Sequence, residues 1–208
     1  MNRFSRTVAC LLLVVSIYGC SAGTQMAGVW RDPTYQGQPN QKVLILALAN
    51  NPRNGLIWEN AFSTALQARG AQPLAGSATI PASAMADTAS IKDAVRKTSA
   101  DLVAVTRLLA VDKEQEYVPG STYYAPAPGY YGYSNYYMSS YAVVSTPGYI
   151  QENTIVKLET NFYDIKTEKL VWSGLTHTVN PQSAQEVATS VAGTIVDDLV
   201  QKKIIRKK

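Results

Sequence analysis

Histidine, cysteine and charged residues are all scarce in this chain of 208 residues. There is one histidine, His177, and the two cysteines, Cys10 and Cys20, both lie near the N-terminus. This supply is too small for a zinc site, an iron–sulfur cluster or a disulfide framework. We therefore expect neither a metal nor a cofactor.

Charged residues make up 16% of the chain, compared with about 25% in an average protein. Nineteen Lys and Arg residues outnumber 15 Asp and Glu residues, which gives a formal net charge of +4. A nucleic-acid partner is not expected, because such proteins usually show a basic face or stripe. Apolar residues, at 46%, are sufficient for a core, and the length suits one domain.

The N-terminus is typical of a secretory signal peptide over residues 1–19. Arg3 and Arg6 form a basic start, and residues 8–18 are an apolar run broken only by Ser16. That run is too short for a transmembrane helix, which needs about 20 apolar residues.

The four residues Ile17-Tyr18-Gly19-Cys20 resemble the bacterial lipobox, although Tyr18 is bulkier than that pattern prefers. The alternative is an ordinary signal peptide with a chance cysteine. The resemblance implies a diacylglycerol on Cys20 and a membrane as a partner. Ser21, in place of Asp, is similar to the pattern of lipoproteins exported to the outer membrane, where the body would face the periplasm.

Residues 20–41 are polar and are interrupted by glycines and prolines, so we predict a lipidated N-terminus and a tether with few regular elements. Trp30 is the exception in this segment. We expect it to dock against the body, and the alternative is a contact with a partner.

Residues 42–208 are predicted to form an α/β domain. The apolar run 42–50 indicates a strand buried on both faces, and residues 56–69 have helical spacing that ends before Gly70. A short strand at 71–74, a loop at 75–89, a helix opened by a capping box at Ser90 and a strand at 101–111 follow. This β-α-β-α-β order favours a mostly parallel sheet.

A β-hairpin and a C-terminal helix complete the predicted mixed sheet. Residues 152–163 and 170–179 give the hairpin, in which we expect Trp172 to be buried. Ser183 and Glu186 form a capping box for the last helix. Apolar spacing places one face of this helix in the core, formed by Ala188, Val191, Ala192, Ile195, Val196 and Leu199. Five basic residues between 202 and 208 suit its C-terminal end, or alternatively anionic lipid head groups.

A tyrosine-rich insertion spans about residues 117–151, which hold ten of the thirteen tyrosines and no charged residue. Such a long loop is usually functional or disordered. It could be a spacer, a binding surface or a segment lying at the membrane interface. The candidate partner-binding residues are Tyr123, Tyr124, Tyr130, Tyr131, Tyr133, Tyr136, Tyr137 and Tyr141.

Nothing in the sequence predicts an enzyme. There is no GxSxG elbow, and His177 is expected to be a solvent-facing strand residue. Acids at positions 101, 112, 114 and 116 are more typical of a strand end than of a glycosidase pair. Asp197 and Asp198 are expected to face solvent.

The lipobox, WRDPTYQGQP, KVLILALAN, EYVPGSTYY and YDIKTEKLVWSG together resemble a group of uncharacterised outer-membrane lipoproteins of Proteobacteria. More distantly, the body is similar to the α/β domains of the TolB N-terminus, the LpoB-type activators and the CsgG-type lipoproteins. The tyrosine-rich insertion departs from these better-known domains, so no functional residue is carried over from them.

Two functional hypotheses follow. In the first, the chain is a non-enzymatic envelope lipoprotein that binds a protein partner through its α/β domain and tyrosine-rich loop. In the second, it binds or hydrolyses peptidoglycan, another envelope glycan or a lipid.

Overall fold

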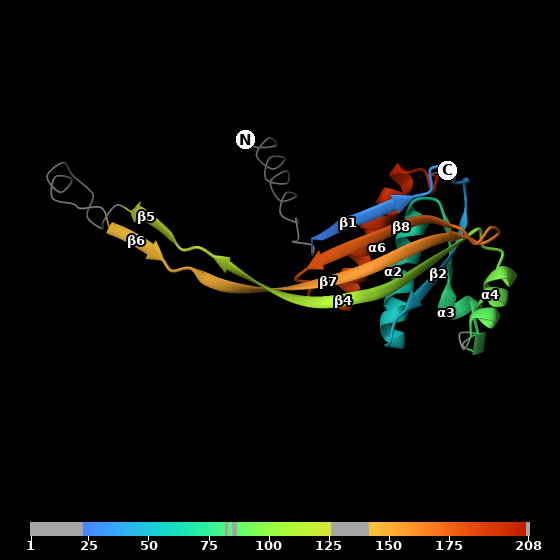
Figure 1. Ribbon diagram of the computed structural model, residues 1–208, viewed down its shortest axis with the longest axis horizontal. Helices are drawn as coiled ribbons and strands as arrows, with labels where there is room; N and C mark the ends of the chain where they lie inside the picture. Colours follow the sequence, from blue (N-terminus) through green and yellow to red (C-terminus); the bar gives the residue numbers. More distant parts are fainter. Residues whose placement is uncertain (1–22, 82, 85–86, 126–141, 207–208) are drawn as a thin grey trace, which may run out of the picture.

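The computed structural model describes residues 23–81, 83–84, 87–125 and 142–206. Its body is a six-stranded mixed sheet in the order β1-β8-β7-β4-β2-β3 (Figure 1). The strands are β1 (Thr24–Arg31), β2 (Lys42–Leu48), β3 (Gln72–Ala75), β4 (Leu102–Val118), β7 (Tyr149–Asp164) and β8 (Leu170–Val179). A two-stranded ribbon of β5 (Ser121–Ala125) and β6 (Ala142–Thr146) lies outside this sheet. The helices are α2 (Pro52–Ala68), α3 (Gly76–Thr79), α4 (Thr88–Lys97) and α6 (Ala184–Gln201). The predicted α/β class, with one small domain and a C-terminal helix, is confirmed.

Strand β2 lies between β3 and β4 and pairs in parallel with both. Its residues from Val43 to Leu46 are buried, as the continuous apolar run predicted. The other half of the sheet is antiparallel, because β4 pairs with β7, β7 with β8, and β8 with β1. The predicted hairpin of β7 and β8 is therefore confirmed.

Helices α2 and α6 cover one face of the sheet and enclose the larger core cluster. Gly70, which has a φ of 87°, follows α2 in the left-handed conformation that favours glycine. All six residues predicted for the inner face of α6 are buried. Trp172 is fully buried and meets Phe162 edge to face at 5.7 Å, which confirms the prediction for that tryptophan.

The opposite face carries a smaller cluster in which α4 and the segment around Ile80 cover β2 and β4. The predicted capping box at Ser90 is wrong, because α4 begins at Thr88 behind the N-cap Asp87. Asp87 Oδ1 accepts hydrogen bonds from the backbone N–H groups of Ala89 and Ser90, both at 2.9 Å. The predicted loop at 75–89 also contains a helical turn, α3, whose Ser77 donates to the buried Glu59.

The prediction of few regular elements in residues 20–41 is wrong, because Thr24–Arg31 forms the edge strand β1 against β8. The chain that follows is also held to the body. Gly37 donates to the carbonyl of Lys203 at 3.2 Å, and Gln36 accepts from Arg206 at 3.1 Å. Trp30 is 48% exposed although its strand is docked, so its expected docking is not seen. The predicted signal peptide 1–19 and Cys20 lie outside the described residues.

Candidate functional site: the β arm and the groove at its base

The antiparallel pair β4–β7 extends from the body as an arm that continues into the ribbon β5–β6 (Figure 1). The ladder between β4 and β7 runs to the pair Val118 and Tyr149. We define the arm as residues 110–125 and 142–157. The insertion predicted at 117–151 is therefore a pair of strands where it is described, apart from residues 119–120 and 147–148, and the arm starts nearer the body than the sequence indicated.

A bulge at Leu109 divides the arm from the body. Leu108 pairs with Leu158, and Ala110 pairs with Lys157, so Leu109 has no partner across the ladder. This extra residue shifts the alternation of side chains by one position. As a result, Val111 lies on the same face as Leu108, although the two residues are three apart.

Beyond the bulge, the two faces of the arm differ in chemistry. One face presents the cross-strand pairs Val111–Val156, Lys113–Thr154, Gln115–Glu152 and Tyr117–Ile150. The opposite face carries Asp112, Glu114 and Glu116, which pair with Ile155, Asn153 and Gln151. The three acids of β4 therefore follow one face of a ribbon, and Asp112 forms an ion pair with Lys157 at 2.7 Å.

Two Pro-Gly steps interrupt the ladder where β4–β7 gives way to β5–β6. Pro119-Gly120 and Pro147-Gly148 lie between the pairs Val118–Tyr149 and Ser121–Thr146. Proline has no N–H group to donate, so the ladder cannot continue there. A Cβ on Gly120 would collide with the backbone of Thr146, so that site has no room for a larger residue. A Cβ on Gly148 would collide with the end of the exposed Tyr117 side chain, which would have to move.

Large apolar side chains are exposed along the arm. Tyr117 is 66% exposed, Tyr149 57%, Ile150 66% and Tyr123 55%. Of the predicted candidates, Tyr123 is thus placed at the surface of β5, and Tyr124 is placed only as a strand residue that pairs with Val143. The remaining candidates lie outside the described residues: Tyr130, Tyr131, Tyr133, Tyr136, Tyr137 and Tyr141. Ile150 was not predicted, because a single isoleucine carries none of the tyrosine enrichment that marks this segment.

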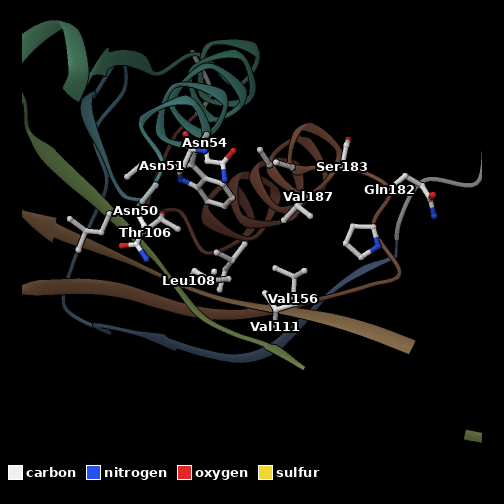
Figure 2. Close-up of a pocket in the computed structure, with 18 residues that line it drawn as sticks. Asn50, Asn51, Asn54, Thr106, Leu108, Val111, Val156, Gln182, Ser183 and Val187 are labelled. Carbon is white, nitrogen blue, oxygen red and sulfur yellow. The ribbon is translucent and has the colours of Figure 1, made fainter. Parts of the chain in front are cut away.

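An open groove of about 580 Å³ lies at the base of the arm (Figure 2). Leu108, Val111 and Val156 form its arm side, where the bulge has brought Leu108 and Val111 onto one face. Its other sides come from the end of β2, the start of α2 and the start of α6. The remaining lining residues are Ala47, Leu48, Ala49, Asn50, Asn51, Asn54, Trp58, Thr106, Leu158, Pro181, Gln182, Ser183, Ala184, Val187 and Ala188.

The groove is apolar at its centre and carries amide groups at its rim. None of its lining residues is charged, and Figure 2 shows Asn50, Asn51 and Asn54 gathered on one side and Gln182 on the other. Both adjacent helices are capped there: Asn51 accepts from the N–H of Arg53 at 2.9 Å, and Ser183 from that of Glu186 at 3.1 Å. Such a surface favours a neutral ligand that is largely apolar.

His177, which was expected to be a solvent-facing strand residue, is half-buried in β8, where it pairs with Gln25 and Lys157. Asp101 lies at the far end of β4 from the arm and accepts from the N–H of Lys42 at 2.9 Å. Within residues 23–206, as far as they are described, no group of three His, Cys, Asp or Glu could hold a metal ion.

The prediction that Asp198 faces solvent is wrong. Its side chain is 15% exposed and accepts a hydrogen bond from Trp172. Asp197 does lie at the surface, where it pairs with Arg69. In the part of the chain that the structure describes, no helix is long and apolar enough to cross a membrane.

Comparison with known proteins gives no matching family model and no matching curated protein. Among solved structures, PelC from Paraburkholderia phytofirmans, described as a dodecamer, is 14% identical, with a TM-score of 0.47 over 85% of this chain and 97% of that chain. The lipoprotein GNA1162 from Neisseria meningitidis is also 14% identical, with a TM-score of 0.39 over 77% of this chain and 99% of that chain. These similarities concern the α/β fold alone.

Proposed function

We propose that this chain is a non-enzymatic lipoprotein of the cell envelope. A lipid on Cys20 anchors it to the outer membrane, its body faces the periplasm, and its arm binds a protein partner. The observation that carries the proposal is the arm itself, an extended ribbon on which Tyr117, Tyr149 and Ile150 are more than half exposed.

The chemistry of the arm favours a protein as the partner. Tyrosine gives a large, rigid contact area with few rotatable bonds, and its hydroxyl group forms hydrogen bonds. A contiguous exposed apolar surface is typical of an interaction site. Among the described strands, the ribbon β5–β6 pairs with no third strand, so a partner strand could add to it through backbone hydrogen bonds. Because an isolated two-stranded hairpin is only marginally stable in water, such a contact would stabilise the arm.

The experiment is a pull-down from crosslinked cells. Replacing residues 120–147 by a short Gly/Ser turn should remove a partner that the unaltered chain captures. We expect Tyr117→Ser combined with Ile150→Ser to weaken capture, because this pair lies on one face of the arm. Glu116→Gln on the opposite face is the matched control. An unchanged set of captured proteins in the replacement variant would overturn the role of the arm.

The anchor is tested separately with Cys20→Ala, which should block lipidation and leave an uncleaved or soluble protein. If this variant still incorporates labelled palmitate and fractionates with the outer membrane, the assignment of the anchor is wrong.

The second candidate is a binder of peptidoglycan or another envelope glycan, which the amide rim of the groove favours through its neutral hydrogen-bonding groups. Co-sedimentation with purified peptidoglycan distinguishes it from the first. This candidate would be supported if the variant without the arm still sediments with peptidoglycan and a variant with Asn54 substituted does not.

A further inference from the structure

We infer that the groove at the base of the arm holds one acyl chain of the lipid on Cys20. This inference rests on the proposed lipid anchor and adds to it a binding site within the body. It is carried by three observations: where the described chain begins, what lines the groove, and how large the groove is.

The first described residue of the chain lies close to the groove. The carbonyl of Gly23 accepts from the N–H of Val179 at 3.4 Å, and Pro181, two residues after Val179, lines the groove. Cys20 precedes Gly23 by three residues, which span at most about 10 Å. Strand β8 lies between β1 and β7, so these two strands are two strand spacings apart, or roughly 10 Å. The reach of the three residues is comparable to this distance. A lipid on Cys20 therefore starts within reach of the groove.

The lining of the groove suits a hydrocarbon chain. Leu48, Leu108 and Val111 are each more than half exposed in the described structure, so an occupant would remove apolar surface from water. The absence of charged side chains from the lining gives an anionic or cationic ligand no counter-charge. The groove volume of about 580 Å³ falls within the range of small-molecule sites, roughly 300–1,000 Å³.

The rim suits the polar end of the same lipid. The amides of Asn50, Asn51 and Gln182 can donate to ester carbonyl groups where an acyl chain meets its glycerol. The start of α6 at the rim adds the positive end of a helix dipole. The groove thus has apolar walls for a chain and neutral donors at its opening. With one acyl chain in the groove and the others in the bilayer, the base of the arm is held against the membrane.

The test is intramolecular photocrosslinking in the full-length lipidated protein. Cells are fed a palmitate analogue that carries a diazirine, the protein is purified in detergent, and label on Cys20 is measured before irradiation. After irradiation, we expect crosslinks to peptides that contain Leu108–Val111 or Pro181–Val187. Crosslinks only to detergent, to another copy of the chain or to the arm beyond Val118 would overturn the inference. Absence of label on Cys20 would overturn the proposed anchor itself, so the two failures are distinguishable.

Adjacent leucines provide a matched pair of variants. Leu108 is 54% exposed and lines the groove, whereas Leu109 is 45% exposed and does not. Leu108→Glu should reduce the intramolecular crosslink several-fold, because it places a charge in the apolar wall. Leu109→Glu should leave the crosslink unchanged, and both variants should carry the same label on Cys20. Equal crosslinking in the two variants would rule out the groove as the site of the acyl chain.

Discussion

The indole Nε1 of Trp172 donates to Oδ2 of Asp198 at 2.8 Å, and the same carboxylate pairs with Lys202 one turn further along the chain. Trp172 is fully buried, and the side chain of Asp198 is 15% exposed. This bond joins the strand β8 to the helix α6 at the edge of the larger core. A buried donor with one fixed acceptor is sensitive to the loss of that acceptor.

Two adjacent acids provide a test of this bond. Asp198→Ala leaves the indole N–H of Trp172 buried without its acceptor, which should cost about 1–3 kcal/mol of unfolding free energy. Asp197→Ala removes only a surface ion pair with Arg69 and should cost about 0–1 kcal/mol. Urea denaturation of both variants checks the difference. Equal losses would show that the Trp172 bond contributes little.

Truncation of Trp172 should have a larger effect. Trp172→Ala removes a fully buried aromatic side chain and should cost about 3–5 kcal/mol. Trp30→Ala, at a position that is 48% exposed, is the matched control and should change stability by about 0.5 kcal/mol or less. The measurement is a thermal melt followed by far-UV circular dichroism. A shift of only a degree or two for Trp172→Ala would contradict its place in the core.

Glu168 should make stability depend on pH. Hydrogen bonds from Lys92 and then Arg96 lower the pKa of its carboxyl group below the ordinary value of 4.5. A lowered pKa in the folded state contributes stability above pH 4.5, and this contribution is lost as the pH falls through the folded-state value. Glu168→Gln should therefore destabilise the protein at neutral pH but not at strongly acidic pH. Urea denaturation at both pH values measures this, and a difference that persists in acid would contradict the assignment.

The bulge predicts that one residue of β4 can be deleted without changing the pairing. Removal of Leu109 would leave Leu108 opposite Leu158 and Ala110 opposite Lys157, as they are now. We expect a folded protein with a similar melting temperature and a less twisted arm. Deletion of Val105, which lies in the regular ladder, should unfold the protein because it moves the side chains between it and the bulge, including the buried Thr106, to the opposite face. The two deletions are compared by circular dichroism, and equal damage would show that Leu109 is not the extra residue.

The helices that pack on the larger core were predicted well because their apolar residues recur at a clear period. Val191, Ile195 and Leu199 are spaced by four, so one face of α6 could be identified without knowing what covers it. The strand β2 was equally clear, since both of its faces are buried and its sequence is continuously apolar.

The arm and β1 could not be predicted in the same way. Both are exposed to solvent on at least one face, and residues on such a face show no apolar periodicity. Every second residue of the arm strand β4 is an acid at Asp112, Glu114 and Glu116. Because no core lies beneath this ribbon, the segment resembles a charged turn in sequence. The strand β1 contains Gly28, and five of its eight residues are exposed. The bulge at Leu109 lies between two apolar neighbours, and no glycine or proline marks it.

The short link between Cys20 and β1 determines how far from its anchor the protein can make contact. The flexible tether expected from the sequence would have let the whole body diffuse around its lipid. Three residues span at most about 10 Å, whereas the strands of the arm beyond the bulge extend about 45 Å at roughly 3.3 Å per residue. With Cys20 lipidated, the distance from the anchor at which the protein can make contact is therefore set mainly by the length of the arm and not by the link that precedes β1.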